Sequence, residues 1–207
     1  MKNVRYCLTA FVVRAGCVLV GLAGCADSTA NQAALAVAPP PPVSLTAASV
    51  SIGEPETTLT DGQIVGIAAA VDEDEVAAGK LAESHAASEK ARAFAQQMVS
   101  AHTDIQSKLI SVADMQGIRT TESNLCRKLK SEDATAGDTL ANMAGVQFDR
   151  AYLADQLRGH EQVVNLLDGT LIPNAQNPAL RSALQEMRAK AIEHLRMARE
   201  ATTAVGG

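Results

Sequence analysis

Residues 148–178, FDRAYLADQLRGHEQVVNLLDGTLIPNAQNP, contain a long helical stripe and the start of a second helix. Only Gln156 and His160 interrupt the apolar face of the stripe. Asn177 followed by Pro178 is a helix-start signal that comes directly after the turn-like segment 172–176. The stretch therefore predicts a helical hairpin with one histidine near the middle of its first arm. The apolar residues of the stripe recur at steps of three and four; they are Phe148, Tyr152, Leu153, Val163, Val164, Leu167 and Leu171.

Three further stripes with helical spacing occur in the chain. One starts at the sequence TDGQ, residues 60–63, which has the form of a capping box. Another starts after Ser88, a good N-cap residue, and stops at Gly117. The third is the second arm of the hairpin, which begins at Pro178. Each of these stripes has a single polar member near its middle; these members are Glu75, His102 and His194.

The order of these segments predicts the fold class. Two helical pairs with short links are separated by residues 118–146, whose weaker pattern predicts one or two short helices joined near Gly137. Alternating strand patterns are absent, and aromatic residues make up only 2% of the chain, so the core must consist mainly of Ala, Leu, Val, Ile and Met. All seven prolines lie outside the predicted helix interiors. We therefore predict an all-α four-helix bundle of two hairpins with a longer helical crossover.

The four polar residues Glu75, His102, His160 and His194 are predicted to converge at one level of the bundle. Buried polar groups need partners, so these side chains must either satisfy one another or bind something. Three imidazoles and a carboxylate could hold one transition-metal ion, or they could form a hydrogen-bond network that fixes the helix register. The chain has no Glu-x-x-His motif, which disfavours a di-iron centre. The remaining histidine, His85, is expected to be exposed at a helix end.

The first residues resemble a bacterial lipoprotein leader. Early positive charges precede a short apolar run and the sequence LAGC, which places Cys25 where a lipid-modified cysteine is expected. A membrane span is disfavoured because Arg14 would lie near its centre. Ala26, rather than Asp, follows the cysteine, which favours the outer membrane, facing the periplasm; an inner-membrane anchor and simple secretion are the alternatives. We predict a signal peptide at 1–24, a disordered Ala/Pro/Ser/Thr tether at 25–58 and the helical domain at 59–203.

Charge and motif content exclude several other functions. The leader holds three of the 18 basic residues and none of the 23 acidic ones, so the remainder has a net charge of −8, which disfavours nucleic-acid binding. No nucleophile elbow, phosphate-binding loop or dinucleotide fingerprint occurs, and no catalytic residue is predicted. If Cys25 is lipidated, Cys126 has no disulfide partner and is expected to be a small, partly buried apolar residue. The expected partners are the membrane, through the lipid, and an envelope protein; the oligomeric state stays open.

The segments LTDGQIVGIAAAVDEDEVAAGKLA, FAQQMVSAHT, FDRAYLADQLRGHEQVVNLL and LIPNAQNPAL resemble the bacterial family DUF4142, in order and with matching spacing over about residues 58–200. That resemblance implies an exported or outer-membrane protein with a ferritin-like helical domain. Glu75 and all three histidines fall at positions that match the family. The family has Asp before the second-helix histidine, where this chain has Ala101. The resemblance implies no activity, so two hypotheses follow: a non-enzymatic envelope protein in maintenance, stress response or partner binding, or a metal-binding or metal-dependent redox protein.

Overall fold

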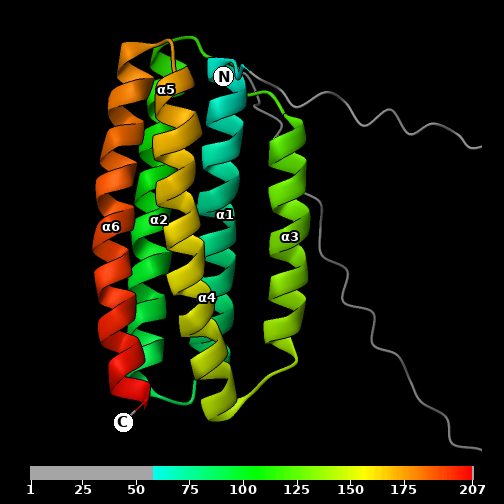
Figure 1. Ribbon diagram of the computed structural model, residues 1–207, viewed down its shortest axis with the longest axis vertical. Coiled ribbons are helices and arrows are strands. Elements are labelled where there is room, and N and C mark those ends of the chain that lie inside the picture. The colour runs from blue at the N-terminus through cyan, green and yellow to red at the C-terminus, as the bar shows by residue number, and fades with distance from the viewer. Residues whose placement is uncertain (1–57, 207) are drawn as a thin grey trace, which may run out of the picture. The chain divides into compact units, whose positions relative to one another are not determined.

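The structure, a computed structural model, describes residues 58–206, which form a bundle of helices (Figure 1). The predicted leader, Cys25 and nearly all of the predicted tether lie outside the described residues. No helix of the described part is long and apolar enough to cross a membrane. The elements are α1 (Asp61–His85), α2 (Glu89–Met115), α3 (Asn124–Ala141), α4 (Gly145–Leu166), the π-helical turn η1 (Leu167–Leu171), α5 (Ile172–Asn174) and α6 (Pro178–Gly206).

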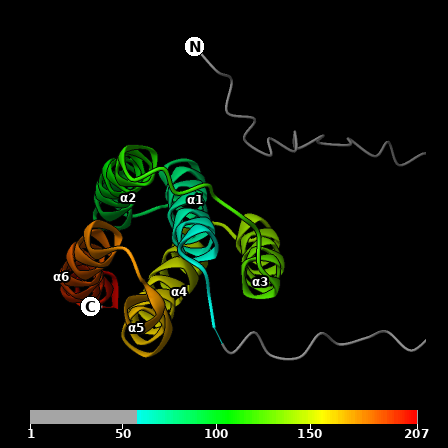
Figure 2. The ribbon, with the colours of Figure 1, turned by 90° about the horizontal axis from the view of Figure 1, so that it is seen from above.

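Four long helical columns form the bundle, as predicted. Seen from above, α1, α2, α6 and the column of α4 and α5 occupy its four corners, and α3 stands outside, against α1 (Figure 2). The pairs α1–α2 and α4–α6 are the two hairpins, and α2 also packs against α6. The prediction of an all-α bundle is confirmed.

The helix starts follow the predicted caps. Thr60 and Gln63 form a complete capping box at the start of α1. The side chain of Ser88 accepts a hydrogen bond from the backbone N–H of Ala91 at the start of α2. Asn177 Oδ1 accepts from the N–H of Leu180 at the start of α6. Gly117, with φ of 67°, follows α2 in the left-handed conformation that favours glycine.

The crossover differs from its prediction. Residues Asn124–Ala141 form one helix that runs through Gly137 without a break. A methyl group at Gly137 would meet no neighbouring atom, so the glycine lies on an open face where it interrupts nothing. This helix buries only Cys126 and Leu140, which explains why its apolar pattern is weak. Cys126 is more fully buried than expected, and its thiol points to the carbonyl oxygen of Gly66 at 3.6 Å.

The third long helix also differs at its end. A turn was expected at 172–176, but the helical path continues through η1 and α5 to Asn174. The π turn still buries Leu167 and Leu171. Pro173 therefore lies in a helical element where a turn was expected, although not in a helix interior. It occupies the first turn of α5, where a missing backbone N–H is tolerated.

A polar layer divides the interior into two apolar clusters. The cluster at the α1 start includes Ile64, Leu109, Leu171 and Leu184. The cluster at the opposite end includes Phe94, Met98, Phe148, Tyr152 and Ala198. Each of the four long helical columns contributes buried polar residues to the layer between the two clusters; they are Asp72, Glu75, His102, Gln156, His160 and His194.

Candidate metal centre

The three histidines of the polar layer lie together in the centre of the bundle. His102 comes from α2, His160 from α4 and His194 from α6, and each side chain is 3% exposed or less. One ring nitrogen from each lies within 4.8 Å of the other two. Their ring centroids are 5.0–5.6 Å apart. The structure therefore brings the three histidines together, as the sequence predicted.

Asp72 of α1 orients the ring of His102. The Nδ1 atom of His102 lies 2.8 Å from Asp72 Oδ1, and the Asp72 side chain is fully buried. Because a carboxylate accepts, the proton of His102 belongs on Nδ1, which leaves a lone pair on Nε2. Nε2 is buried and has no hydrogen-bond partner within residues 58–206. This arrangement matches the carboxylate–histidine pairs that support metal ligands in proteins.

His160 is oriented by its own helix. Its Nδ1 lies 2.9 Å from the carbonyl oxygen of Gln156, one turn earlier, so Nδ1–H donates to that oxygen. Its Nε2 lies 3.2 Å from Nδ1 of His194 and, with its own proton on Nδ1, accepts a hydrogen bond from the Nδ1–H of His194. Both fixed rings, at His102 and at His160, thus direct an Nε2 lone pair toward the interior of the cluster.

Glu75 lies at the same level but on the far side of the His160 ring. Its Oε1 is 3.6 Å from His160 Nδ1, and its Oε2 accepts a 2.9 Å hydrogen bond from Gln156 Nε2. The set of mutually close ligand atoms consists of the three imidazoles without Glu75. In this position the carboxylate supports the ring of His160. A role for Glu75 as a direct ligand remains a prediction.

Burial affects the protonation of the cluster. It lowers the pKa of His194 to about 3, with His102 and His160 contributing, so this imidazole is neutral over the physiological range. Burial also raises the pKa of Asp72, while the hydrogen bond with His102 opposes the rise. Gln156 Oε1 and Asp72 Oδ2 are buried without a partner in the described part of the chain. A layer with this many unpaired acceptor atoms is one that a bound cation would stabilise.

Asp72 is the residue that sequence reasoning missed. It lies three residues before Glu75 and therefore on the same face of the helix, and that spacing could have identified it. Ala101, where the family has Asp, does not deprive His102 of support, because Asp72 supplies it from α1. His85, expected to be exposed, is half-buried, with its ring centroid 5.4 Å from that of Phe148.

Three half-buried aspartates gather next to Glu75, where α3 joins the bundle. Burial raises the pKa of Asp74 to about 7, with repulsion from Asp133, Glu75 and Asp155 adding to the rise. Burial and the neighbouring carboxylates likewise raise the pKa of Asp133 to about 6. These carboxyls come from α1, α3 and α4, so their repulsion acts between helices.

The raised pKa values, caused by burial first and by repulsion second, make the stability of the fold depend on pH. They exceed the ordinary aspartate pKa of 3.8, so the folded state holds more protons between about pH 4 and 7. The free energy of unfolding therefore falls as pH rises through that window. The depressed pKa of His194 acts in the opposite direction below pH 6.5.

Asp133→Asn should therefore raise the melting temperature at pH 8 by several degrees and much less at pH 5. The matched control is Asp138→Asn, exposed on the same helix. Identical profiles for the two variants, measured by thermal denaturation, would contradict the prediction.

Comparisons with known proteins agree with the fold. A solved DUF305 protein from Streptomyces coelicolor, described as a candidate secreted protein, aligns with a TM-score of 0.59 at 12% identity, over 71% of this chain and 94% of that one. That likeness shows a shared fold. Among curated proteins no match is found. A family model described as a domain of unknown function, DUF4142, matches residues 46–201, beginning inside the predicted tether. With most of its length matched, the chain belongs to the DUF4142 family.

Proposed function

We propose that this protein binds one transition-metal ion through His102, His160 and His194 and that it does so in the cell envelope, held there by a lipid on Cys25. The observation that carries the metal proposal is the group of three buried imidazoles within 4.8 Å of one another, one of which has a ring nitrogen without a partner among the described residues. The proposed biological setting is envelope maintenance or stress response.

The geometry of the cluster is close to that of a metal site. A tetrahedral ion with bonds of about 2.0–2.1 Å to nitrogen requires ligand atoms about 3.3 Å apart. The Nε2 of His160 and the Nδ1 of His194 are already 3.2 Å apart. The nitrogen of the third imidazole lies within 4.8 Å of these two, so a shift of about 1.5 Å or less completes the set. Neutral His194 can move its ring proton to Nε2 to free Nδ1.

The donor set selects the class of metal. Imidazole nitrogen suits zinc, copper, iron and nickel, whereas calcium and magnesium prefer oxygen. Three protein ligands leave one position open, which is the arrangement of a site that exchanges water or a small ligand. A bound ion would act there as a Lewis acid. Asp72 and the Gln156 carbonyl would hold the two imidazole rings and increase their basicity.

Metal analysis of the tag-free protein tests this proposal. After removal of metal and reconstitution with zinc or cobalt, we expect about one equivalent bound per chain. Cobalt should give the visible absorption of a site with nitrogen ligands. Less than about a tenth of an equivalent of every ion tested would overturn the proposal.

A second candidate function is purely structural, with no metal involved. The hydrogen bond between His160 and His194 supports it, because two imidazoles can satisfy each other. In that case the polar layer fixes the register of the helices, and the bundle acts by binding an envelope partner. His160→Leu distinguishes the two: a folded variant of equal or higher stability, with a metal content unchanged from that of the wild type, favours the structural role, while loss of one bound equivalent favours the site.

The lipid anchor has its own test. The proposal rests on the leader pattern that ends at Cys25. We expect the wild-type protein in the membrane fraction and Cys25→Ala in the soluble fraction, because the acyl chains contribute the membrane affinity. Cys126→Ala serves as the control for loss of a thiol. A Cys25→Ala protein that stays in the membrane fraction would contradict the anchor.

A further inference from the structure

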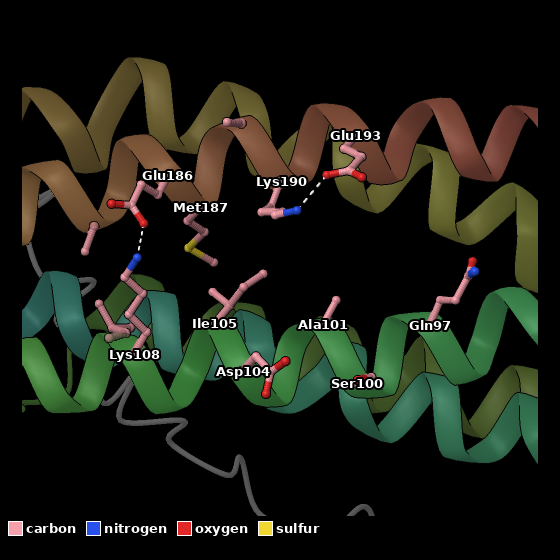
Figure 3. Close-up of a pocket in the computed structure, with 13 residues that line it drawn as sticks. Gln97, Ser100, Ala101, Asp104, Ile105, Lys108, Glu186, Met187, Lys190 and Glu193 are labelled. Carbon is pink, nitrogen blue, oxygen red and sulfur yellow. Dashed lines mark hydrogen bonds and ion pairs between the residues drawn. The ribbon is translucent and has the colours of Figure 1, made fainter.

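A groove of about 750 Å³ runs along the seam between α2 and α6 (Figure 3). Its lining includes Ala101 and Ile105 of α2, which flank His102 in the sequence. On α6 it includes Lys190 and Glu193, which precede His194 by one turn and by one residue. The groove therefore lies on the solvent side of α2 and α6, the helices that supply His102 and His194.

Two of the three imidazoles come from the helices that border this groove, His102 from α2 and His194 from α6. Each is 3% exposed, against 1% for His160 of α4. The path from the groove to the cluster therefore passes the side chains of these two helices.

A side-chain bond joins α2 to α6 at one end of the groove but not farther along it. At one end Lys108 of α2 bonds to Glu186 of α6 and joins the two helices (Figure 3). Farther along, Lys190 instead bonds to Glu193 of its own helix at 2.8 Å. Among the residues drawn in Figure 3, no marked interaction joins α2 to α6 at Ala101. The small side chain of Ala101 leaves the space beside the Lys190–Glu193 pair unfilled.

Lys190 is near enough to the cluster to act on a cation there. It lies one turn before His194 on α6 and lines the groove together with Glu193. Its ammonium bonds to the Glu193 carboxylate. The groove lining carries the carboxylates of Asp104, Glu186 and Glu193 against the ammonium groups of Lys108 and Lys190, so loss of the Lys190 charge leaves Glu193 free to attract a divalent ion that approaches along this seam.

We propose that metal ions enter and leave the three-histidine cluster through the groove between α2 and α6, passing between Ala101 and the Lys190–Glu193 pair. This inference rests on the proposed metal-binding function. The opposite seam, between α1 and α4, is the competing route: there Gly159 lies over Glu75, and a methyl group at Gly159 would be 3.7 Å from Glu75 Oε1, an ordinary contact.

Rates of metal binding test the route. In stopped-flow experiments with the metal-free protein and Co²⁺, Ala101→Leu should slow association and dissociation alike, by about tenfold, and leave the equilibrium affinity nearly unchanged, because a barrier on the path affects both directions. Gly159→Ala, which adds a methyl on the opposite seam, should keep wild-type rates. Circular dichroism establishes that both variants are folded.

Removing the charge at the entrance gives an independent measurement. Lys190→Met should speed association by about threefold at low ionic strength, and the gain should shrink as salt is added. Lys80→Met, which removes an exposed charge from α1, is the control and should not reproduce the gain. If Ala101→Leu does not fold, the comparison of Lys190→Met with Lys80→Met still tests the route.

The outcomes separate the two proposals. Wild-type protein that binds no metal overturns both. Wild-type protein that binds one equivalent, with rates unchanged in Ala101→Leu and Lys190→Met, overturns only the route. Equal slowing in Ala101→Leu and Gly159→Ala also overturns the route, because it shows a general effect of packing.

Discussion

Replacing His102 with alanine is expected to lower the affinity of the bundle for zinc or cobalt by more than about 100-fold, which is the upper end of the loss caused by removing only the partner of a ligand. His102 supplies the one ring nitrogen of the cluster that is buried without a hydrogen-bond partner among residues 58–206. Two imidazoles remain in the variant, too few for a stable buried site. Competition with a chelator of known affinity measures the loss.

Asp72→Asn should have a smaller effect of the same sign, about 10- to 100-fold, because it removes the carboxylate that fixes the ring of His102 and leaves the ligand itself. Glu73→Gln, a neutralisation of the adjacent exposed carboxylate, is the matched control and should bind as the wild type does. Equal affinities for Asp72→Asn and Glu73→Gln would exclude a supporting role for Asp72. Wild-type affinity in His102→Ala would exclude the three-histidine site.

The residues that sequence reasoning placed correctly are those governed by local rules. The capping box at Thr60 and the N-cap at Ser88 act within one turn, and apolar spacing is a property of one helix. Two hairpins with similar arm lengths then bring the middles of their helices to one level. For this reason the meeting of His102, His160 and His194 could be predicted without coordinates.

The rest of the site depends on how each helix is rotated and how closely it packs. Gly79 allows α1 to approach α2, since a methyl group there would lie 2.6 Å from a methyl of Val99. That approach decides that Asp72 meets His102, while Glu75 turns to Gln156 and the far side of the His160 ring. Periodicity gives the face of a helix to within about one residue. Because Asp72 and Glu75 share a face, periodicity alone could not assign their hydrogen-bond partners.

The missed features of the fold have a similar origin. The π turn at Leu167–Leu171 keeps two leucines buried while the chain continues past the expected end of the helix. Such a turn depends on packing against α6 and leaves no pattern in the sequence. The crossover helix, which buries only Cys126 and Leu140, is defined mainly by its N-cap at Ser123 and by its contact with α1.

The polar layer affects stability as well as binding. It interrupts the apolar interior between the two clusters, and buried polar atoms without partners cost free energy. The bundle must therefore be held together at its two ends. Two aspartates do this in the same way, each at the start of one helix and each accepting two backbone hydrogen bonds from the turn of the other hairpin.

Asp149→Ala is expected to destabilise the fold by about 3 kcal/mol, because it removes two charged hydrogen bonds and leaves their donors unpaired. Asp149, in the second turn of α4, is fully buried. Its two oxygens accept from the N–H groups of Ala87 at 2.9 Å and Ser88 at 2.8 Å, which joins the α1–α2 turn to the second hairpin. Its carboxylate also lies at the N-terminus of α2, whose N-cap is Ser88, and negative charge is favoured there. Urea denaturation followed by circular dichroism gives the free energy of unfolding.

Asp61→Ala is the matched control at the other end of the bundle. Asp61 accepts from the N–H groups of Gln176 at 2.8 Å and Asn177 at 3.0 Å with the same geometry, but it is only half-buried, so water can replace the lost bonds and the loss should be about 1 kcal/mol. Asp149→Asn, which keeps the shape but only one acceptor, should fall between these values. If Asp149→Ala and Asp61→Ala lose the same free energy, burial does not set the strength of these contacts, and the stability of the bundle must come from its apolar clusters alone.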